Sequence, residues 1–229
     1  MPLQGASGAT LADPLALGVL RVNEVFLSVQ GESSRVGLPT VFVRLTGCPL
    51  RCRWCDTEYA FHEGANRSVA DLLDDVRRHG ARHVCVTGGE PLAQPAVHAL
   101  MRALLDAGHE VSLETSGALD TAPVDPRVRV VMDLKCPDSG EVGRNRWANL
   151  AHLRAHDELK FVLASRADYD WMREVLQREG LTQRCGVLAS PVWGELDPAR
   201  LAEWILADQL DVRLQVQLHK VLWQDARGR

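Results

Sequence analysis

The sequence predicts an α/β fold built on a mainly parallel β-sheet. Short runs rich in β-branched and aromatic residues recur along the chain, and stretches with helical periodicity separate most of them. Strands that alternate with helices form βαβ units, whose strands run parallel. The chain has 229 residues, which suits one domain. We expect residues 1–18, which are rich in small residues and lack a strong period, to form a disordered lead-in, and residues 19–229 to form a single domain.

The two kinds of segment follow one another from residue 19 onward. Val19 to Val29 alternates loosely and predicts a strand or an extended arm, followed by a turn at 30–34. Further strands are predicted at 40–46, 83–87, 110–115, 128–134, 158–163, 186–190 and 212–218. Helices are predicted from Ser68 to Gly80, at 95–107, 146–155 and 167–179, and from Asp197 onward.

Several of the predicted helices have recognisable ends. Ser68 and Asp71 have the spacing of a capping box, and Gly80 suits the left-handed position that often ends a helix. Asp197 is a favourable N-cap, and Pro198 suits the first helical position. These signals make the boundaries of the two helices specific predictions.

The composition argues against several classes of protein. The formal net charge of −4 argues against a general nucleic-acid binder or a protein of the membrane surface. We find neither an apolar run that approaches the length of a membrane span nor a secretory signal. Three of the six cysteines lie in one tight motif, whereas Cys85, Cys136 and Cys185 are isolated, which fits a reduced, cytoplasmic setting better than a disulfide framework.

One face of the predicted sheet carries many polar residues. Because successive strand residues point to opposite sides, Arg44 lies opposite Val43 and Leu45. Other strands place polar residues in the same way: Ser112, Glu114, Asp133, Lys135, Gln215, Gln217 and His219. So many polar groups would be costly in a dry core, so we expect them to line a ligand cavity near the C-terminal ends of the strands. A half-solvated antiparallel sheet is the alternative, but the intervening helices argue against it.

A tight group of cysteines follows the apolar run 41–45. Cys48, Cys52 and Cys55 have the spacing C-x-x-x-C-x-x-C. Three thiolates this close together can bind one face of a [4Fe–4S] cluster and leave its fourth iron open to another ligand. A structural zinc site is the alternative. Zinc usually needs a fourth ligand, and the obvious candidate, His62, lies seven residues beyond Cys55.

Lysine is rare in this chain. Three lysines, Lys135, Lys160 and Lys220, stand among 26 lysines and arginines. A lysine ammonium and an arginine guanidinium make different contacts, so a chain that prefers arginine elsewhere makes its few lysines candidate site residues. Chance retention is the alternative for Lys160 and Lys220.

Several motifs resemble those of a known family. The cysteine motif and the run Gly-Gly-Glu-Pro at 88–91 resemble the radical S-adenosylmethionine (radical SAM) superfamily. Gln-Gly-Glu at 30–32, Arg-Leu-Thr-Gly-Cys at 44–48 and Cys-Asp-Thr at 55–57 resemble more specifically the 7-carboxy-7-deazaguanine synthase family. The matching pieces, including Gln-Leu-His-Lys at 217–220, run from about residue 19 to the end.

The resemblance implies a partial (β/α)6-type radical SAM barrel, mainly parallel, with the cluster at the C-terminal end of the strands. It implies a carbon–nitrogen lyase of queuosine and deazapurine biosynthesis. This enzyme would convert 6-carboxy-5,6,7,8-tetrahydropterin to 7-carboxy-7-deazaguanine with release of ammonia. Its cofactors would be a [4Fe–4S] cluster, SAM and Mg²⁺. A 5′-deoxyadenosyl radical made from SAM would take a hydrogen from C6 of the pterin and later return it, so that SAM is regenerated.

The resemblance also implies roles for individual residues. The cluster would be held by Cys48, Cys52 and Cys55, and Mg²⁺ by Thr57. No side chain is implied as catalytic, because the radical is generated on SAM. SAM would be bound by Trp54, Cys55, Asp56, Gly89, Glu90, Asp133, Leu134, Lys135 and Ser190. The substrate would be bound by Val29, Gln30, Gly31, Arg44, Thr87 and His219, with Arg44 at its carboxylate.

Some of these residues also have ordinary structural explanations. Residues 88–91 suit a plain strand-to-helix turn, and Trp54 can pack beside the cysteines without binding a ligand. The Thr57 hydroxyl can stabilise a turn, and His219 can be a structural histidine. The chain also departs from the family pattern, with Ser33 after Gln-Gly-Glu, an acidic loop at 138–140 and about ten residues beyond His219.

Two other functions stay open at this point. One is an activating enzyme that makes a glycyl radical on a protein partner, and the other is a non-catalytic iron–sulfur redox protein. The synthase would bind a small pterin, receive electrons from a donor such as flavodoxin or ferredoxin, and act as a homodimer. Neither nucleic acid nor a membrane is an expected partner.

Overall fold

The computed structural model describes residues 18–224 and 226–229, and within them the strands form one mixed sheet. The sheet order is β3-β1-β2-β4-β5-β6-β7-β8-β9. The strands are β1 (Val19–Val29), β2 (Pro39–Leu45), β3 (Ala65–Ser68), β4 (His83–Gly88), β5 (Glu110–Thr115), β6 (Arg129–Asp133), β7 (Glu158–Leu163), β8 (Gly186–Pro191) and β9 (Arg213–Leu214). The predicted lead-in at 1–18 lies outside the described residues, apart from Gly18.

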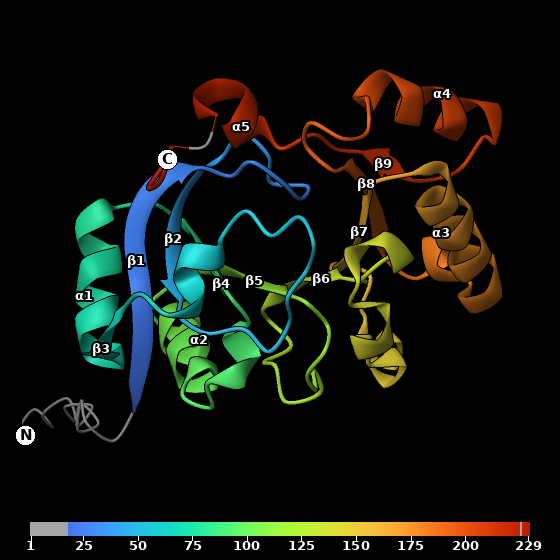
Figure 1. Ribbon diagram of the computed structural model, residues 1–229. Helices are drawn as coiled ribbons and strands as arrows, with labels where there is room; N and C mark the ends of the chain where they lie inside the picture. The colour runs from blue at the N-terminus through green and yellow to red at the C-terminus, as the bar shows by residue number, and fades with distance from the viewer. Residues whose placement is uncertain (1–17, 225) are drawn as a thin grey trace, which may run out of the picture.

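The parallel part of the sheet runs from β2 through β9, and only β1 pairs antiparallel, with β2 and with β3. Figure 1 shows these strands as an arc from β1 to β9. Because β3 and β9 are the two ends of the order, the arc is an open, partial barrel. The predicted α/β class and mainly parallel sheet are therefore confirmed.

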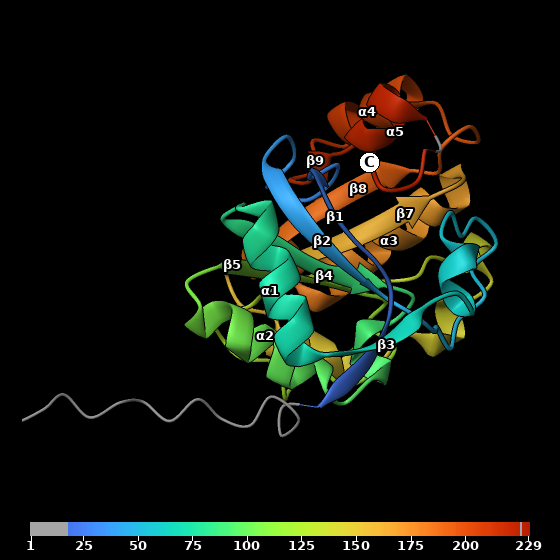
Figure 2. The ribbon, with the colours of Figure 1, turned by 90° about the vertical axis from the view of Figure 1, so that its left-hand side faces the viewer.

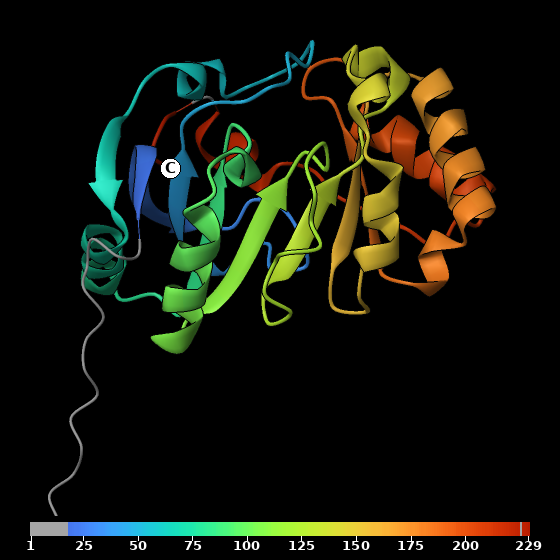
Figure 3. The same ribbon diagram turned by 90° about the horizontal axis from the view of Figure 1, so that it is seen from below.

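The longer helices cover the outside of this arc: α1 (Val69–His79), α2 (Val97–Asp106), α3 (Arg166–Glu179) and α4 (Pro198–Ala207). The short α5 (Leu218–Trp223) lies instead beside the turn after β1. Figure 2 shows α1 and α2 on the flank formed by β1, β2 and β4, and Figure 3 shows α3 at the opposite end of the sheet. Apolar faces of strands and helices meet in one buried core. Within the described residues, each helix falls short of the length and apolarity needed to cross a membrane.

The predicted helix ends are found where the sequence signals lie. The Ser68 hydroxyl accepts a hydrogen bond from the Asp71 backbone N–H, and the Asp71 carboxylate accepts one from Ser68, which completes the capping box of α1. Gly80 ends this helix with a φ of 70°. Asp197 caps α4 by accepting from the Ala199 N–H.

Two predicted elements differ in the structure. The predicted helix at 146–155 is a 3-10 helix, Trp147–His152, because the buried Asn149 side chain donates to the carbonyls of Gly117 and Leu119 and so ties the segment to the loop after β5. The predicted strand at 212–218 is paired only over Arg213–Leu214. Beyond it the Gln215 side chain bonds both the N–H and the carbonyl of Ser33.

The chain then turns into α5, so His219 lies on a helix and not on a strand. The sequence also gave no sign of β3, which lacks β-branched residues but pairs with the start of β1.

Candidate active site

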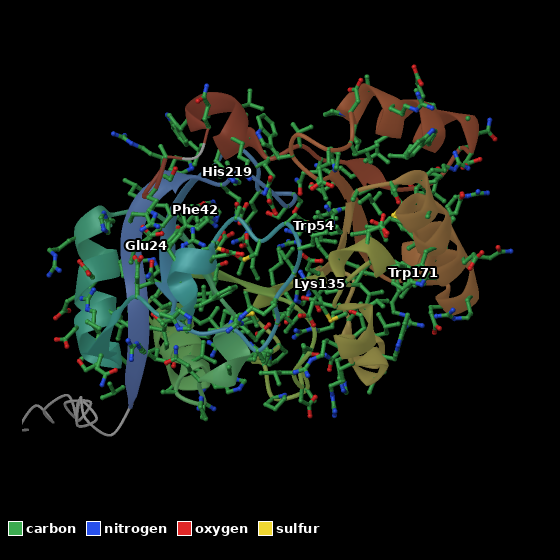
Figure 4. The ribbon with its side chains drawn as sticks, viewed as in Figure 1. Glu24, Phe42, Trp54, Lys135, Trp171 and His219 are labelled. Atoms are coloured by element: carbon green, nitrogen blue, oxygen red, sulfur yellow. The ribbon has the colours of Figure 1, made fainter. Side chains whose placement is uncertain are left out.

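A cavity of about 620 Å³ lies at the C-terminal ends of the parallel strands. Its wall takes residues from the ends of β2, β4, β5, β6 and β7, from the loop after β2 and from α5. Figure 4 shows Glu24, Phe42, Trp54, Lys135 and His219 around this interior, whereas Trp171 lies on α3 at the outside. Most of the polar face predicted from the sequence lines this cavity, namely Arg44, Glu114, Asp133, Lys135, Gln217 and His219, whereas Ser112 and Gln215 are buried and do not line it.

All three cysteines of the motif line this cavity. The loop that carries them is attached to the loop after β6: the Arg53 N–H donates to the Ser139 carbonyl at 3.0 Å, and the Arg51 N–H donates to Glu141 Oε1. Burial raises the pKa of each of the three thiols. A metal centre, rather than the surrounding charges, would therefore hold them as thiolates.

The Gly88-Gly89 turn packs against the start of the cysteine loop. Gly88 has a φ of 138°, which a side chain would rarely allow, and a Cβ on Gly89 would collide with the Gly47 carbonyl. The Glu90 N–H donates to that same carbonyl at 2.8 Å. The two glycines thus allow the end of β4 to hold the backbone beside Cys48 directly.

Three of the predicted SAM-binding residues, Glu90, Leu134 and Ser190, lie beside the cavity wall but do not line it. The Glu90 carboxylate is fully buried and accepts hydrogen bonds from the Thr115 hydroxyl and from Ser116. The Ser190 hydroxyl donates to the Gln215 carbonyl. Their contact with SAM stays a prediction, and so does that of the residues that do line the cavity: Trp54, Cys55, Asp56, Gly89, Asp133 and Lys135.

Two lysines and two carboxylates form a charged group on the interior wall. Lys135 Nζ lies 2.9 Å from Asp133 Oδ2, and Lys160 Nζ lies 2.5 Å from Glu32 Oε2. Lys160 also lies 3.9 Å from Asp133, which joins the two pairs. Burial by itself would lower the pKa of each lysine, but the neighbouring carboxylates outweigh it and raise both pKa values. Both lysines are therefore ammonium groups facing the cavity.

The third lysine lies at the cavity mouth. Lys220 Nζ lies 3.3 Å from Asp56 Oδ2, and the Thr57 hydroxyl donates to Asp56 Oδ1 at 2.8 Å. Burial would raise the pKa of Asp56, but Lys220 and the hydrogen bonds lower it to about 2. Asp56 and Thr57 thus present an ionised carboxylate and a hydroxyl side by side, directly after Cys55.

The predicted substrate residues also lie around this cavity. Val29, Gln30, Gly31, Arg44, Thr87 and His219 all line it. The Thr87 hydroxyl donates to Glu114 Oε2 at 2.8 Å, and the Gln30 amide donates to Glu114 Oε1 at 3.3 Å. A Cβ on Gly31 would collide with the His219 ring, so this glycine allows α5 to approach the turn after β1.

Aromatic side chains supply flat surfaces near these polar groups. Phe26 and Phe42 stack with their ring centroids 5.1 Å apart and an interplanar angle of 11°. Phe42, Tyr59 and Trp193 also line the cavity. Such an arrangement suits a planar, polar ligand, which can stack on a ring while its edges form hydrogen bonds.

Several cavity residues were not predicted as site residues. Tyr59 carried no local signal, Glu32 belonged to the Gln-Gly-Glu motif without an assigned role, and Glu114 was noted only for its place on the polar face. Glu24, which pairs with Arg44 but does not itself line the cavity, also carried no local signal. Lys160 and Lys220 were marked by the scarcity of lysine, and both line the cavity beside Lys135. The segment after α5 lies here too, with the Arg227 guanidinium 3.8 Å from the Tyr59 ring centroid.

Comparison with known proteins gives consistent results. Residues 42–139 match the model of the Radical SAM superfamily. The 7-carboxy-7-deazaguanine synthase of Chlorobaculum tepidum is 44% identical over 91% of this chain and 97% of its own length, and that of Koribacter versatilis is 42% identical over 89% and 97%. The crystal structure of QueE from Escherichia coli superposes with a TM-score of 0.68 at 26% identity, covering 87% of this chain and 94% of that one.

Proposed function

Because the chain belongs to the 7-carboxy-7-deazaguanine synthase family of radical SAM enzymes, we propose that it converts 6-carboxy-5,6,7,8-tetrahydropterin to 7-carboxy-7-deazaguanine and ammonia. The observation that carries this proposal is one cavity whose lining includes three cysteines as well as Arg44, Gln30, Thr87 and His219. The first group suits a cluster, and the second suits a planar anion with polar edges.

The donor set of the cysteine loop fits a [4Fe–4S] cluster. Cys48, Cys52 and Cys55 would hold it, whereas Cys85, Cys136 and Cys185 are buried elsewhere. A bound, reduced cluster would supply the electron for reductive cleavage of SAM. The protein around it binds and orients the two ligands and limits the access of water to them.

Asp133 and Lys135, within the set of two lysines and two carboxylates on the interior wall, offer a place for SAM. Asp133 Oδ1 is buried and lacks a hydrogen-bond partner among the described residues. Lys135 lies on the same stretch of chain and also lines the cavity, close enough to Cys52 for their charges to interact. An acceptor and an ammonium group here suit the amino and carboxylate groups of a bound amino-acid derivative.

The residues after the cysteine motif fit Mg²⁺. Hard divalent cations prefer oxygen ligands, and Mg²⁺ usually takes one or two protein groups together with substrate oxygens and waters. The Thr57 hydroxyl would be such a ligand, next to the ionised Asp56. Mg²⁺ would then orient the substrate carboxylate.

The residues of the cavity favour the synthase over the two alternatives. A glycyl-radical activating enzyme must admit a polypeptide, whereas here the turn after β1 and α5 lie over the cavity and bring Gln30 and His219 into it. A redox protein without turnover has no use for Arg44, Glu114 and three lysines in one cavity.

A flavodoxin or ferredoxin is the proposed electron donor, and a homodimer is the proposed working form.

The test is anaerobic incubation of the cluster-loaded protein with SAM, a reductant and the carboxypterin. We expect the deazaguanine and ammonia in equal amounts, with SAM not consumed. The Cys52→Ala protein is the matched control and should make neither. Reductive cleavage of SAM without formation of the deazaguanine would contradict the proposed substrate while leaving the radical SAM assignment intact.

A further inference from the structure

A carboxylate on the neighbouring strand holds the proposed substrate-binding arginine. Glu24 on β1 lies directly opposite Arg44 on β2, and Glu24 Oε1 accepts a hydrogen bond from Arg44 Nε at 2.8 Å. The Tyr59 hydroxyl donates to the same oxygen at 3.0 Å. Both charged side chains are mostly buried, with 17% of Arg44 and 21% of Glu24 exposed.

An irregularity in β1 brings Glu24 to this position. The pairing with β2 shifts between Val22, which lies opposite Leu45, and Glu24. If the pairing continued regularly from Val22, Asn23 would lie opposite Arg44, and Glu24 would lie opposite Val43. Instead Asn23 is the extra residue, and its side chain donates to the Glu63 carbonyl. Bulges of this kind re-aim side chains next to functional sites.

The contact with Glu24 occupies one edge of the guanidinium and leaves its other end open. Arg44 lines the cavity, and its terminal nitrogens Nη1 and Nη2 form no hydrogen bond with any described residue. A guanidinium can bind a carboxylate through two parallel hydrogen bonds. With Nε taken, the pair Nη1 and Nη2 is the edge that stays available to a ligand.

Resting on the proposed function, we propose that Glu24, assisted by Tyr59, is a positioning residue that fixes Arg44 so that its Nη1–Nη2 end binds the substrate carboxylate. Tyr59 supports this arrangement by donating its hydroxyl hydrogen to the oxygen of Glu24 that also accepts from Arg44. The Arg227 guanidinium lies over the Tyr59 ring, 3.8 Å from its centroid. The substrate carboxylate would therefore meet an arginine whose position is fixed from two sides.

The experiment compares two ligands in cluster-loaded, SAM-bound protein without reductant. One is 6-carboxytetrahydropterin, and the other is tetrahydropterin, which lacks the carboxylate. In Glu24→Met, whose side chain cannot accept a hydrogen bond, we expect the Kd for the carboxylated compound to rise about tenfold or more. The Kd for tetrahydropterin should change little. Glu24→Gln, which keeps an acceptor, and Tyr59→Phe should give smaller effects in the same direction.

Two further measurements separate positioning from a general structural role. Glu63→Gln is the matched control, since it removes a carboxylate that pairs with Arg227 at 3.2 Å but does not touch Arg44. In turnover assays Glu24→Gln should raise KM and leave kcat nearly unchanged. In an Arg44→Lys background, Glu24→Gln should add little further loss, because the two side chains act as one unit.

If Glu24→Met weakened the binding of both ligands equally, the inference would be overturned, since Glu24 would then support the whole cavity. Tighter binding of the carboxylated compound by Glu24→Gln would also overturn it, because Glu24 would then compete with the substrate. Wild-type protein that binds both compounds alike would overturn the proposed function and this inference together.

Discussion

Lys160 on β7 and Glu32 in the turn after β1 form an ion pair inside the partial barrel, with 2.5 Å between Nζ and Oε2. Only 14% of Lys160 and 11% of Glu32 is exposed. The pair connects the antiparallel edge of the sheet to a strand several positions away in the sheet order. It therefore contributes both to the cavity wall and to the closure of the arc.

The first prediction concerns this pair and pH. Lys160→Met leaves the Glu32 carboxylate buried and without its cation, so the free energy of unfolding should fall by about 1–3 kcal/mol at pH 7. Lys160 lowers the pKa of Glu32 against the effect of burial. The stabilisation from Glu32 is therefore present above its ordinary pKa of 4.5 and is lost as the pH falls below that value.

Urea unfolding of wild type and Lys160→Met across this pH range measures the effect. The difference between the two proteins should narrow as Glu32 becomes protonated. Arg77→Met, which removes an exposed partner of Asp74, is the control and should change stability little at any pH. A constant difference between wild type and Lys160→Met from pH 7 to pH 3 would contradict the prediction.

The second prediction concerns the cluster. Anaerobically purified protein should be brown and contain about four irons per chain, as a [4Fe–4S] centre requires. The Cys52→Ala protein should lose the cluster, because the substitution removes one of the three thiolates that would bind it. Cys136→Ala should keep it, since Cys136 is buried in the core. Iron content and visible absorbance give the answer, and the opposite behaviour of the two variants would refute the assignment.

The third prediction concerns Arg44. Arg44→Lys keeps the charge but loses the planar fork, so carboxypterin binding should weaken by about 1.5–3 kcal/mol. Iron content should stay the same, because Arg44 does not contact the cysteine loop through any hydrogen bond among the described residues. A titration with the carboxypterin measures this, and unchanged affinity would place the substrate carboxylate elsewhere.

The fourth prediction concerns Thr57 and Mg²⁺. Mg²⁺ should raise turnover and tighten substrate binding, because the substrate carboxylate completes the metal site. Thr57→Ala should blunt this response, whereas Thr57→Ser keeps the hydroxyl and should preserve most of it. Turnover measured against Mg²⁺ concentration distinguishes the three proteins. Identical curves for wild type and Thr57→Ala would mean that the hydroxyl serves only to hold Asp56.

Local chemical signals predicted much of the fold and many of the residues that line the cavity. The two ends of α1 could be predicted from Ser68 and Gly80, because capping depends on residues that are neighbours in the chain. The scarcity of lysine indicated functional positions, and the structure brings all three lysines to the cavity. In both cases the information lies within a few residues or in the composition.

The failures depend on contacts between distant segments. The strand predicted at 212–218 is cut short where Gln215 bonds Ser33, which lies 182 residues away in the sequence. Glu24 faces Arg44 only because of an irregularity in pairing, and a single extra residue in a strand leaves no mark in the sequence pattern. Predicting such positions requires the register between strands.

The contact between the Gly88-Gly89 turn and the cysteine loop has a consequence for repair. The hydrogen bonds to the Gly47 and Leu45 carbonyls come from the backbone and use no cysteine thiol, so they do not depend on a bond between a thiol and a metal. Oxygen that destroys the iron–sulfur centre would leave Cys48 in place beside the turn. The backbone on either side of Cys52 is likewise held, through Arg51 and Arg53, so reassembly would start from a formed loop and would not require refolding.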